Sequence, residues 1–201
     1  MGIYNWKRKG KTIYNIDMII GILTYHCVPN FGAQLQTTST VGYLRRIGHK
    51  PVVLNWYPKD LEEMYSRRVP AEQIATHNAY TKAKLPITEI CRTEDELVSA
   101  IEHYGAEAIV VGSDALFKFI PQRRRMVFSR RRLCFVPRSI TSVEKFDGNP
   151  FFGAFVKKLS NGCPIVAFSV SSQNCPYFDM NKEEREKMRG AMQNFSLITD
   201  D

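Results

Sequence analysis

Residues that can bind or activate a hydroxylated ligand occur in three segments, each directly after a run of apolar residues. Their side chains are mostly hydroxyls, amides and aromatic rings with glycines between them: Tyr25, His26, Asn30, Phe31, Gly32 and Gln34 in the first segment, Gly112, Ser113 and Asp114 in the second, and Ser171 and Gln173 in the third. Such groups suit hydrogen bonding to a sugar. Asp114 is the one acid among them, so it is the candidate catalytic residue, able to accept a proton from a hydroxyl held within about 3 Å.

A structural interpretation of the same residues stays open. Asp114 also fits the N-cap of a following helix. Gly32 fits a tight turn that needs a positive φ, and His26 fits a simple internal hydrogen bond. Residue type and spacing leave both interpretations in place.

The first segment lies inside a predicted βαβ unit. Residues 18–23 are apolar and rich in β-branched side chains, which is typical of a buried strand. A loop over 24–32 precedes a predicted helix over 33–47, with Gly48 as its C-cap, and residues 51–57 form a second strand. Ligands bind beyond the carboxyl ends of such strands, beside helix N-termini, so this loop is a plausible anion or hydroxyl site. The dinucleotide pattern G-x-G-x-x-G is absent.

The remaining pattern predicts one doubly wound α/β sheet, mostly parallel and Rossmann-like. Further strands are expected over 108–111, 164–170 and 195–199. Helices are expected over 61–84 with a break at Pro70, over 93–104 after a capping box, from 149–150 to 159, and over 181–194. Residues 1–15 are predicted to be a basic tail, and residues 16–201 a Rossmann-like domain that carries a long irregular insertion at about 117–150.

Two motifs resemble the polysaccharide pyruvyl transferases. The first runs through GILTYH at 21–26, NFGAQLQ at 30–36 and the stretch 44–49, and the second is AIVVGSD at 108–114. The resemblance implies transfer of a pyruvyl group from phosphoenolpyruvate to a sugar of a polysaccharide or its precursor, as a ketal. It also implies a GT-B-like fold, of which this chain is the N-terminal, acceptor-side lobe. The C-terminal domain would then be absent, and the chain alone inactive. Many members have Asp where this chain has Ala33.

A strongly basic segment gives a second hypothesis from another class. Of the 28 Lys and Arg residues, seven Arg lie between residues 122 and 138, which contain no acid, so 21 basic residues elsewhere face 20 acidic ones. This segment suits a non-catalytic anion- or glycan-binding α/β module that docks on a polyanion: an anionic glycan, a lipid surface or nucleic acid. Aromatic residues do not alternate regularly with the arginines, which argues against specific nucleic-acid binding. Steep salt dependence would separate the two hypotheses.

Cysteine usage and hydropathy indicate the cellular compartment. Five scattered cysteines without a C-x-x-C motif predict free thiols and no metal site. No apolar stretch reaches the roughly 20 residues of a membrane span, and no signal-peptide cleavage pattern follows the basic start. We therefore expect a cytoplasmic protein without a cofactor other than the donor substrate, and its oligomeric state stays open.

Overall fold

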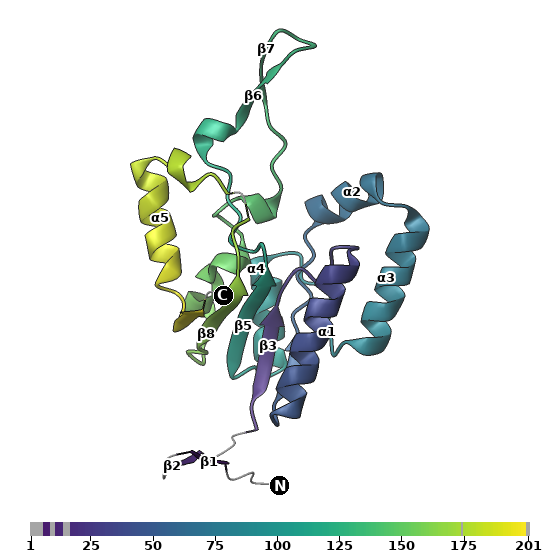
Figure 1. The fold of residues 1–201 in the computed structure, drawn as a ribbon, viewed down its shortest axis with the longest axis vertical. Helices are drawn as coiled ribbons and strands as arrows, with labels where there is room; N and C mark the ends of the chain where they lie inside the picture. The colour runs from purple at the N-terminus through teal and green to yellow at the C-terminus, as the bar shows by residue number, and fades with distance from the viewer. Residues whose placement is uncertain (1–5, 9–10, 14–16, 174, 200–201) are drawn as a thin grey trace.

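The computed structural model describes residues 6–8, 11–13, 17–173 and 175–199. Its centre is a parallel sheet in the order β4-β3-β5-β8-β9 (Figure 1). The strands are β3 (Ile19–Leu23), β4 (Lys50–Val53), β5 (Ala108–Asp114), β8 (Ile165–Val170) and β9 (Leu197–Thr199). This arrangement confirms the predicted α/β doubly wound fold.

Helices and two hairpins make up the rest of the regular structure in the described residues. The helices are α1 (Phe31–Arg46), α2 (Lys59–Arg68), α3 (Ala71–Lys84), α4 (Glu94–His103) and α5 (Lys182–Met192). The antiparallel pairs are β1 (Trp6–Arg8) with β2 (Lys11–Ile13), inside the predicted basic tail, and β6 (Met126–Ser129) with β7 (Cys134–Pro137). Five short 3₁₀ helices are η1 (Gln122–Arg124), η2 (Ser142–Glu144), η3 (Pro150–Phe152), η4 (Ala154–Lys158) and η5 (Tyr177–Asp179).

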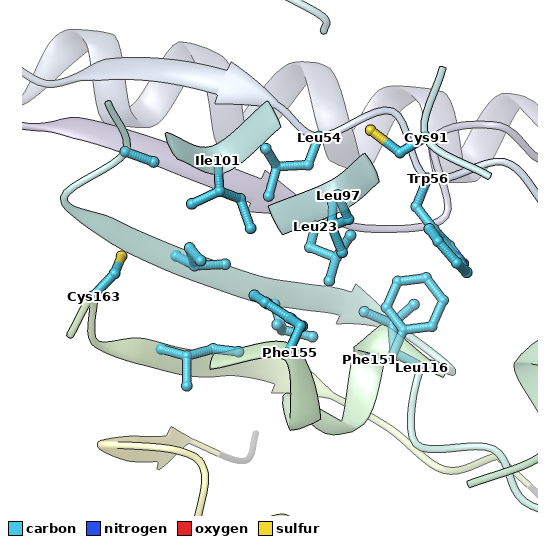
Figure 2. Close-up of a cluster of buried hydrophobic side chains, with 14 of the residues drawn as sticks. Leu23, Leu54, Trp56, Cys91, Leu97, Ile101, Leu116, Phe151, Phe155 and Cys163 are labelled. Carbon is cyan, nitrogen blue, oxygen red and sulfur yellow. The ribbon is translucent and has the colours of Figure 1, made fainter. Parts of the chain in front are cut away.

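Alternation along the strands divides the core between the two faces of the sheet. Ile20 and Ile22 of β3 face α1, where they pack with Val41 and Leu44. The next side chain, Leu23, faces the opposite side. There it joins a larger cluster that includes Leu97 and Ile101 of α4 with Phe151 and Phe155 of the 3₁₀ helices (Figure 2). Continuous burial on both faces is what the near-unbroken apolar runs of these strands predict.

Side-chain caps explain where α1, α4 and α5 begin. The Thr93 hydroxyl accepts the Glu96 N–H, and Asn181 forms a reciprocal capping box with Glu184, so α4 and α5 begin where the sequence predicts. Gly48, with φ of 95°, follows the end of α1 as expected.

Several boundaries differ from the prediction, among them the end of β5, which extends through Asp114 instead of stopping at residue 111. Helix α1 begins at Phe31 rather than at residue 33, because Asn30 caps it; Gly32 therefore lies in the helix, and its φ is not positive. Strand β4 ends at Val53, well before the predicted residue 57. The helix expected from 149–150 to 159 is two 3₁₀ helices, since Gly153 between them takes a left-handed φ of 73°.

The segment predicted to be irregular, 117–150, contains both core and protruding structure. Phe117 and Phe119 are buried and pack in a cluster with Phe152 and Met180. Between them and η2, the β6–β7 hairpin projects away from the sheet (Figure 1). A stretch that lacked helical or strand periodicity therefore combines core-filling aromatics with an exposed hairpin.

Candidate functional site

A pocket of about 800 Å³ lies beyond the carboxyl ends of β3 and β5. The chain crosses from β3 to β4 on one side and reaches β5 on the other, so this is the point where the strand order reverses. Parallel α/β sheets bind ligands at such points. Residues from all three predicted loops line the pocket: Tyr25, Val28 and Asn30 from the first, Ala115 from the second and Gln173 from the third.

Asn30 has two roles that fall on different atoms of its amide. Its Oδ1 accepts the backbone N–H of Gly32 at 2.7 Å and that of Ala33 at 3.4 Å, which caps α1. Its Nδ2 makes no hydrogen bond with any described residue. The side chain is exposed at the pocket, so the Nδ2 donor is available to a ligand while Oδ1 holds the helix.

Backbone and ring contacts hold the loops together. The Phe117 N–H donates to the Ser171 carbonyl at 3.2 Å, which ties the loop after β5 to the loop after β8. Tyr25 packs edge-on against the buried Phe151 ring at 4.9 Å between centroids. The pocket floor is therefore anchored in the core, while Gln173 lies exposed at its rim with φ of 50°.

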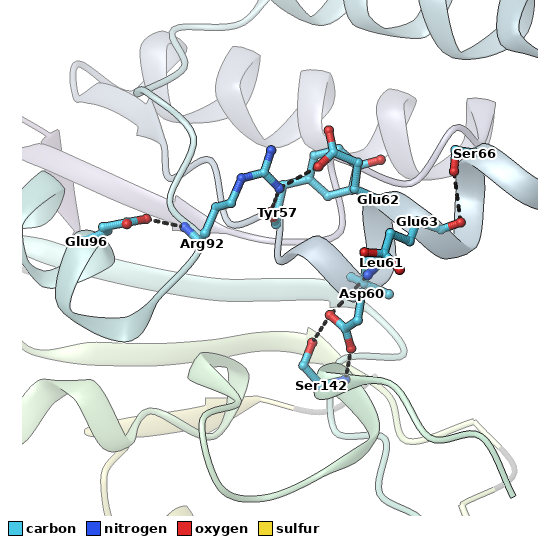
Figure 3. A network of polar contacts seen from close by, with 9 residues as sticks. All are labelled: Tyr57, Asp60, Leu61, Glu62, Glu63, Ser66, Arg92, Glu96 and Ser142. Atoms are coloured by element: carbon cyan, nitrogen blue, oxygen red, sulfur yellow. Dashed lines mark hydrogen bonds and ion pairs between the residues drawn. The ribbon is translucent and has the colours of Figure 1, made fainter.

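Two walls of the pocket were not predicted from the sequence. One is α2, which contributes Asp60, Glu63, Met64, Arg67 and Arg68, and the other is the stretch 138–144. Asp60 joins them: its carboxylate accepts the Ser142 N–H at 2.5 Å and the Ser142 hydroxyl at 2.9 Å (Figure 3). No local pattern marks this pairing, because each wall is formed by residues far from the other in the chain.

Arg92 fixes the other side of α2. Its guanidinium pairs with Glu62 at 2.7 Å and donates to the Tyr57 carbonyl at 3.0 Å (Figure 3). Its backbone N–H donates to Glu96 at 2.6 Å. Helix α2 is thereby held between Arg92 and the 138–144 stretch, which keeps one wall of the pocket in place.

Two of the four cationic side chains that line the pocket have no acidic partner among the described residues. Lys118 pairs with Glu144 at 3.1 Å, and Arg67 pairs with Glu63 at 3.5 Å. Arg68 and Arg138 form no ion pair with any described residue. Lys118, Arg138 and Gln173 also line an adjoining hollow of about 430 Å³. Two unpaired guanidinium groups beside amide donors suit a phosphate or carboxylate ligand.

Glu144 is held ionised in this wall. Burial alone would raise its pKa, but the Thr141 hydrogen bonds and the Lys118 ammonium lower the pKa overall. Its carboxylate is thus committed to Thr141 and Lys118 and serves to orient the wall.

His26 lies in a second pocket of about 690 Å³, near α3. Its Nδ1 lies 3.2 Å from the Thr24 carbonyl and its Nε2 lies 2.9 Å from the Asn55 Oδ1. Burial lowers the pKa of His26, although both hydrogen bonds oppose that shift. Burial also lowers the pKa of His77, which lines the same pocket, with partial compensation from the Asn78 side chain. The structure therefore separates His26 from Tyr25, Asn30 and Gln173.

Four other predicted site residues, Phe31, Gln34, Gly112 and Ser171, do not line the larger pocket. Phe31 is 79% exposed at the start of α1. Gln34 is buried, and its amide donates to the His77 carbonyl at 3.0 Å and the Thr81 hydroxyl at 3.1 Å, which fastens α1 to α3. Gly112 lies against β8, where an added Cβ would come within 2.2 Å of the Phe168 carbonyl oxygen. Ser171 is exposed on the loop after β8.

Asp114 and Ser113 end strand β5, and Asp114 is paired in register with Val170. Their side chains lie outside what the structure describes. The backbone places both residues at the carboxyl edge of the sheet, next to Ala115 of the pocket. The catalytic role of Asp114 stays a prediction.

Thiols and metal ligands do not contribute to the pocket. All five cysteines are free, and burial raises the pKa of Cys27 to about 12 and those of Cys91 and Cys163 to about 11. Among the described residues, no group of His, Cys, Asp and Glu is arranged to hold a metal ion. Within the same part of the chain, none of the helices is both long and apolar enough to cross a bilayer.

The chain was compared with known proteins in three ways. No family model, no curated protein and no solved structure matches it. The resemblance to the pyruvyl transferases therefore remains a sequence-based hypothesis, and the structure shows the α/β fold with a polar pocket at the carboxyl edge of its sheet.

Proposed function

We propose that this chain is the acceptor-side domain of a polysaccharide pyruvyl transferase, and that its larger pocket also contributes two arginines to the binding of the donor, phosphoenolpyruvate. The observation that carries the proposal is the composition of the larger pocket. Side chains from the loops that carry the resemblance, Tyr25 and Asn30, lie there together with the unpaired Arg68 and Arg138. A pyruvyl transferase needs such a combination, because it must bind the hydroxyls of a sugar and the two anionic groups of phosphoenolpyruvate.

The reaction assigns separate tasks to these groups. C3 of phosphoenolpyruvate gains a proton and becomes a methyl group, two sugar oxygens bond to C2, and phosphate leaves with its bridging oxygen. One hydroxyl proton accounts for the methyl group and the other leaves with the phosphate. Arg68 and Arg138 would bind the phosphate and carboxylate, and the amides of Asn30 and Gln173 would orient the sugar. Asp114 would accept a hydroxyl proton.

A second candidate function is a non-catalytic anion- or glycan-binding module. One observation favours it: Arg130, Arg131 and Arg132 are exposed at the turn of the β6–β7 hairpin and form no ion pair with any described residue. In this case anions would bind at the hairpin and not in the pocket.

Binding measurements on matched variants separate the two. For the transferase, calorimetry should show saturable binding of phosphoenolpyruvate that inorganic phosphate displaces. Arg68→Gln and Arg138→Gln should each weaken this binding roughly tenfold or more, since each removes a charge-assisted contact. Arg46→Gln, at an exposed site on α1, is the control and should have no effect.

The outcomes that count against the transferase are distinct. No binding of phosphoenolpyruvate, or binding unchanged in both Arg68→Gln and Arg138→Gln, would contradict it. Binding of a sulfated glycan that disappears in Arg130→Ser/Arg131→Ser/Arg132→Ser, without any binding of phosphoenolpyruvate, would support the module instead. Candidate acceptor sugars are tested in parallel by ligand-observed NMR.

A further inference from the structure

The β6–β7 hairpin and its flanks, residues 122–138, form a protruding arm that we call the arginine arm. The strands pair in register from Met126 opposite Pro137 to Ser129 opposite Cys134. In Figure 1 the arm extends away from the sheet and its covering helices. Residues on both of its faces are exposed or only half-buried, so neither face packs on the body of the protein.

The arm exposes large apolar side chains. Phe128 is 54% exposed, Phe135 is 67% exposed and Leu133 is 78% exposed, and the two phenylalanine rings meet edge-on at 5.5 Å across the strands. Met126 and Val127 are also exposed on the same hairpin. Contiguous exposed apolar groups on a soluble domain usually mark a surface that is covered by something else. An isolated two-stranded hairpin is also marginally stable in water, so it benefits from a partner.

Charge on the arm narrows the choice of partner. It carries seven arginines and no acidic residue. At its base Arg124 pairs with Asp179, and Arg125 lies over the Phe119 ring. The three arginines of the turn, Arg130–Arg132, form no ion pair with any described residue. A partner must therefore be anionic, and a second copy of the arm would be repelled by like charge.

Apolar and cationic groups at one tip fit the interface of an anionic bilayer. Aromatic and aliphatic side chains gain from leaving water at the boundary between headgroups and acyl chains, while arginines stay among the anionic headgroups. Nucleic acid would use the arginines and the two rings, but would leave Leu133, the aliphatic residue of the turn, in water. This exposed aliphatic side chain at the tip therefore favours lipid.

We propose that the arginine arm docks the protein on anionic lipid surfaces. Phe128, Leu133 and Phe135 enter the interface, and Arg130, Arg131 and Arg132 bind the headgroups around them. This inference does not depend on pyruvyl transfer, because none of these six residues lines the pocket.

Vesicle sedimentation tests the proposal on the full chain. The protein should bind vesicles of phosphatidylcholine mixed with phosphatidylglycerol, should not bind phosphatidylcholine alone, and should dissociate as salt is raised. Arg130→Ser/Arg131→Ser/Arg132→Ser should lower the partition coefficient on the order of a hundredfold. Leu133→Ser/Phe135→Ser, which keeps every charge, should lower it about tenfold or more.

Two controls keep the result interpretable. Arg46→Ser/Lys84→Ser/Arg189→Ser removes the same charge from exposed sites on α1, α3 and α5 and should bind nearly as the wild type does. Replacing residues 126–137 by a short Gly-Ser linker should abolish vesicle binding and leave the melting transition in place. If that variant fails to fold, the serine variants decide.

Several results would overturn the proposal. These are equal binding to neutral and anionic vesicles, full binding by either serine variant of the tip, or no vesicle binding by the wild type. Tighter binding to a DNA duplex, lost with Arg130–Arg132 but unchanged in Leu133→Ser/Phe135→Ser, would assign the arm to nucleic acid. Concentration-dependent dimers that require Leu133 and Phe135 would assign it to self-association.

Discussion

The carboxylate of Asp60 binds Ser142 at two points, the backbone N–H at 2.5 Å and the hydroxyl at 2.9 Å, although the two residues are 82 positions apart. This contact closes one wall of the larger pocket. Asp60→Ala should therefore lower the free energy of unfolding by about 1–2 kcal/mol, a value reduced for solvent exposure. Urea unfolding measures it, and phosphoenolpyruvate binding should weaken in the same variant.

Ser142→Ala is the matched comparison for Asp60. It removes the hydroxyl and leaves the backbone N–H, so it should cost less than half as much as Asp60→Ala. Equal losses in the two variants would show that the hydroxyl contact accounts for the whole effect and that the backbone contact contributes nothing.

Two glycines give opposite predictions for the same substitution. At Gly112 an added Cβ would lie 2.2 Å from the Phe168 carbonyl oxygen, so β5 and β8 would have to separate. Gly112→Ala should destabilise by about 2 kcal/mol or more. At Gly42, in the interior of α1, an added Cβ meets nothing within 4 Å. Gly42→Ala should stabilise by up to about 1 kcal/mol through helix propensity. Thermal melting compares them, and a tolerated Gly112→Ala would mean that the two strands are less closely paired than described.

Asn30 allows stability and ligand binding to be separated. Asn30→Ala removes the cap of α1, so it should lower the free energy of unfolding by about 1 kcal/mol. It also removes the Nδ2 donor, so it should weaken the binding of sugars. Asn30→Asp keeps an oxygen acceptor for the Gly32 and Ala33 N–H groups and places a negative charge at the helix N-terminus, so stability should be unchanged or slightly higher. It loses the Nδ2 donor, so ligand-observed NMR should show weaker binding of sugars. Retained binding in Asn30→Asp would remove Asn30 from the site.

Acidification should destabilise the fold through two buried histidines. Burial lowers the pKa of His26 and of His77 below the ordinary value of 6.5. Below about pH 7 the unfolded chain therefore binds more protons than the folded chain, and stability falls as the pH falls through 6.5. Urea midpoints at intervals from pH 8 to pH 5 follow this loss, a window above the ordinary carboxylate range.

The histidine variants fix the origin of that slope. His26→Gln/His77→Gln should flatten the profile, even if it lowers stability throughout. His103→Gln, at an exposed site on α4, should keep the wild-type slope. An unchanged slope in the double variant would assign the pH dependence to other groups.

Local patterns predicted those parts of the fold that depend on local physics. Apolar runs identified the sheet strands, and the capping residues Thr93 and Asn181 identified the starts of α4 and α5. Strand topology also predicts a site at the carboxyl edge of the sheet, where Tyr25, Asn30 and Gln173 line the larger pocket, and their role in binding stays a prediction. The same reasoning misassigned Gly32 to a turn, because a glycine in a loop-like sequence also fits the first turn of a capped helix.

Long-range pairings could not be predicted in the same way. The walls formed by α2 and by residues 138–144 depend on the contact between Asp60 and Ser142, which no spacing reveals. The hairpin was missed because its turn lacks Gly, Asn and Pro. Leu133 takes the positive φ of 52° that usually identifies a turn by one of those residues. His26 and Tyr25 are neighbours in one loop, as predicted, but their side chains line different pockets.

The strand order also determines how freely the arm can change in the course of evolution. The arm leaves the chain between β5 and β8, two strands that pair directly with each other. Its length therefore enters the folding equilibrium only through the entropy of closing the connection between these strands. That entropy grows with the logarithm of length, so that even doubling the connection costs only about 0.6 kcal/mol. Related proteins could carry arms of quite different length and charge on the same sheet, each directing the same pocket to a different surface.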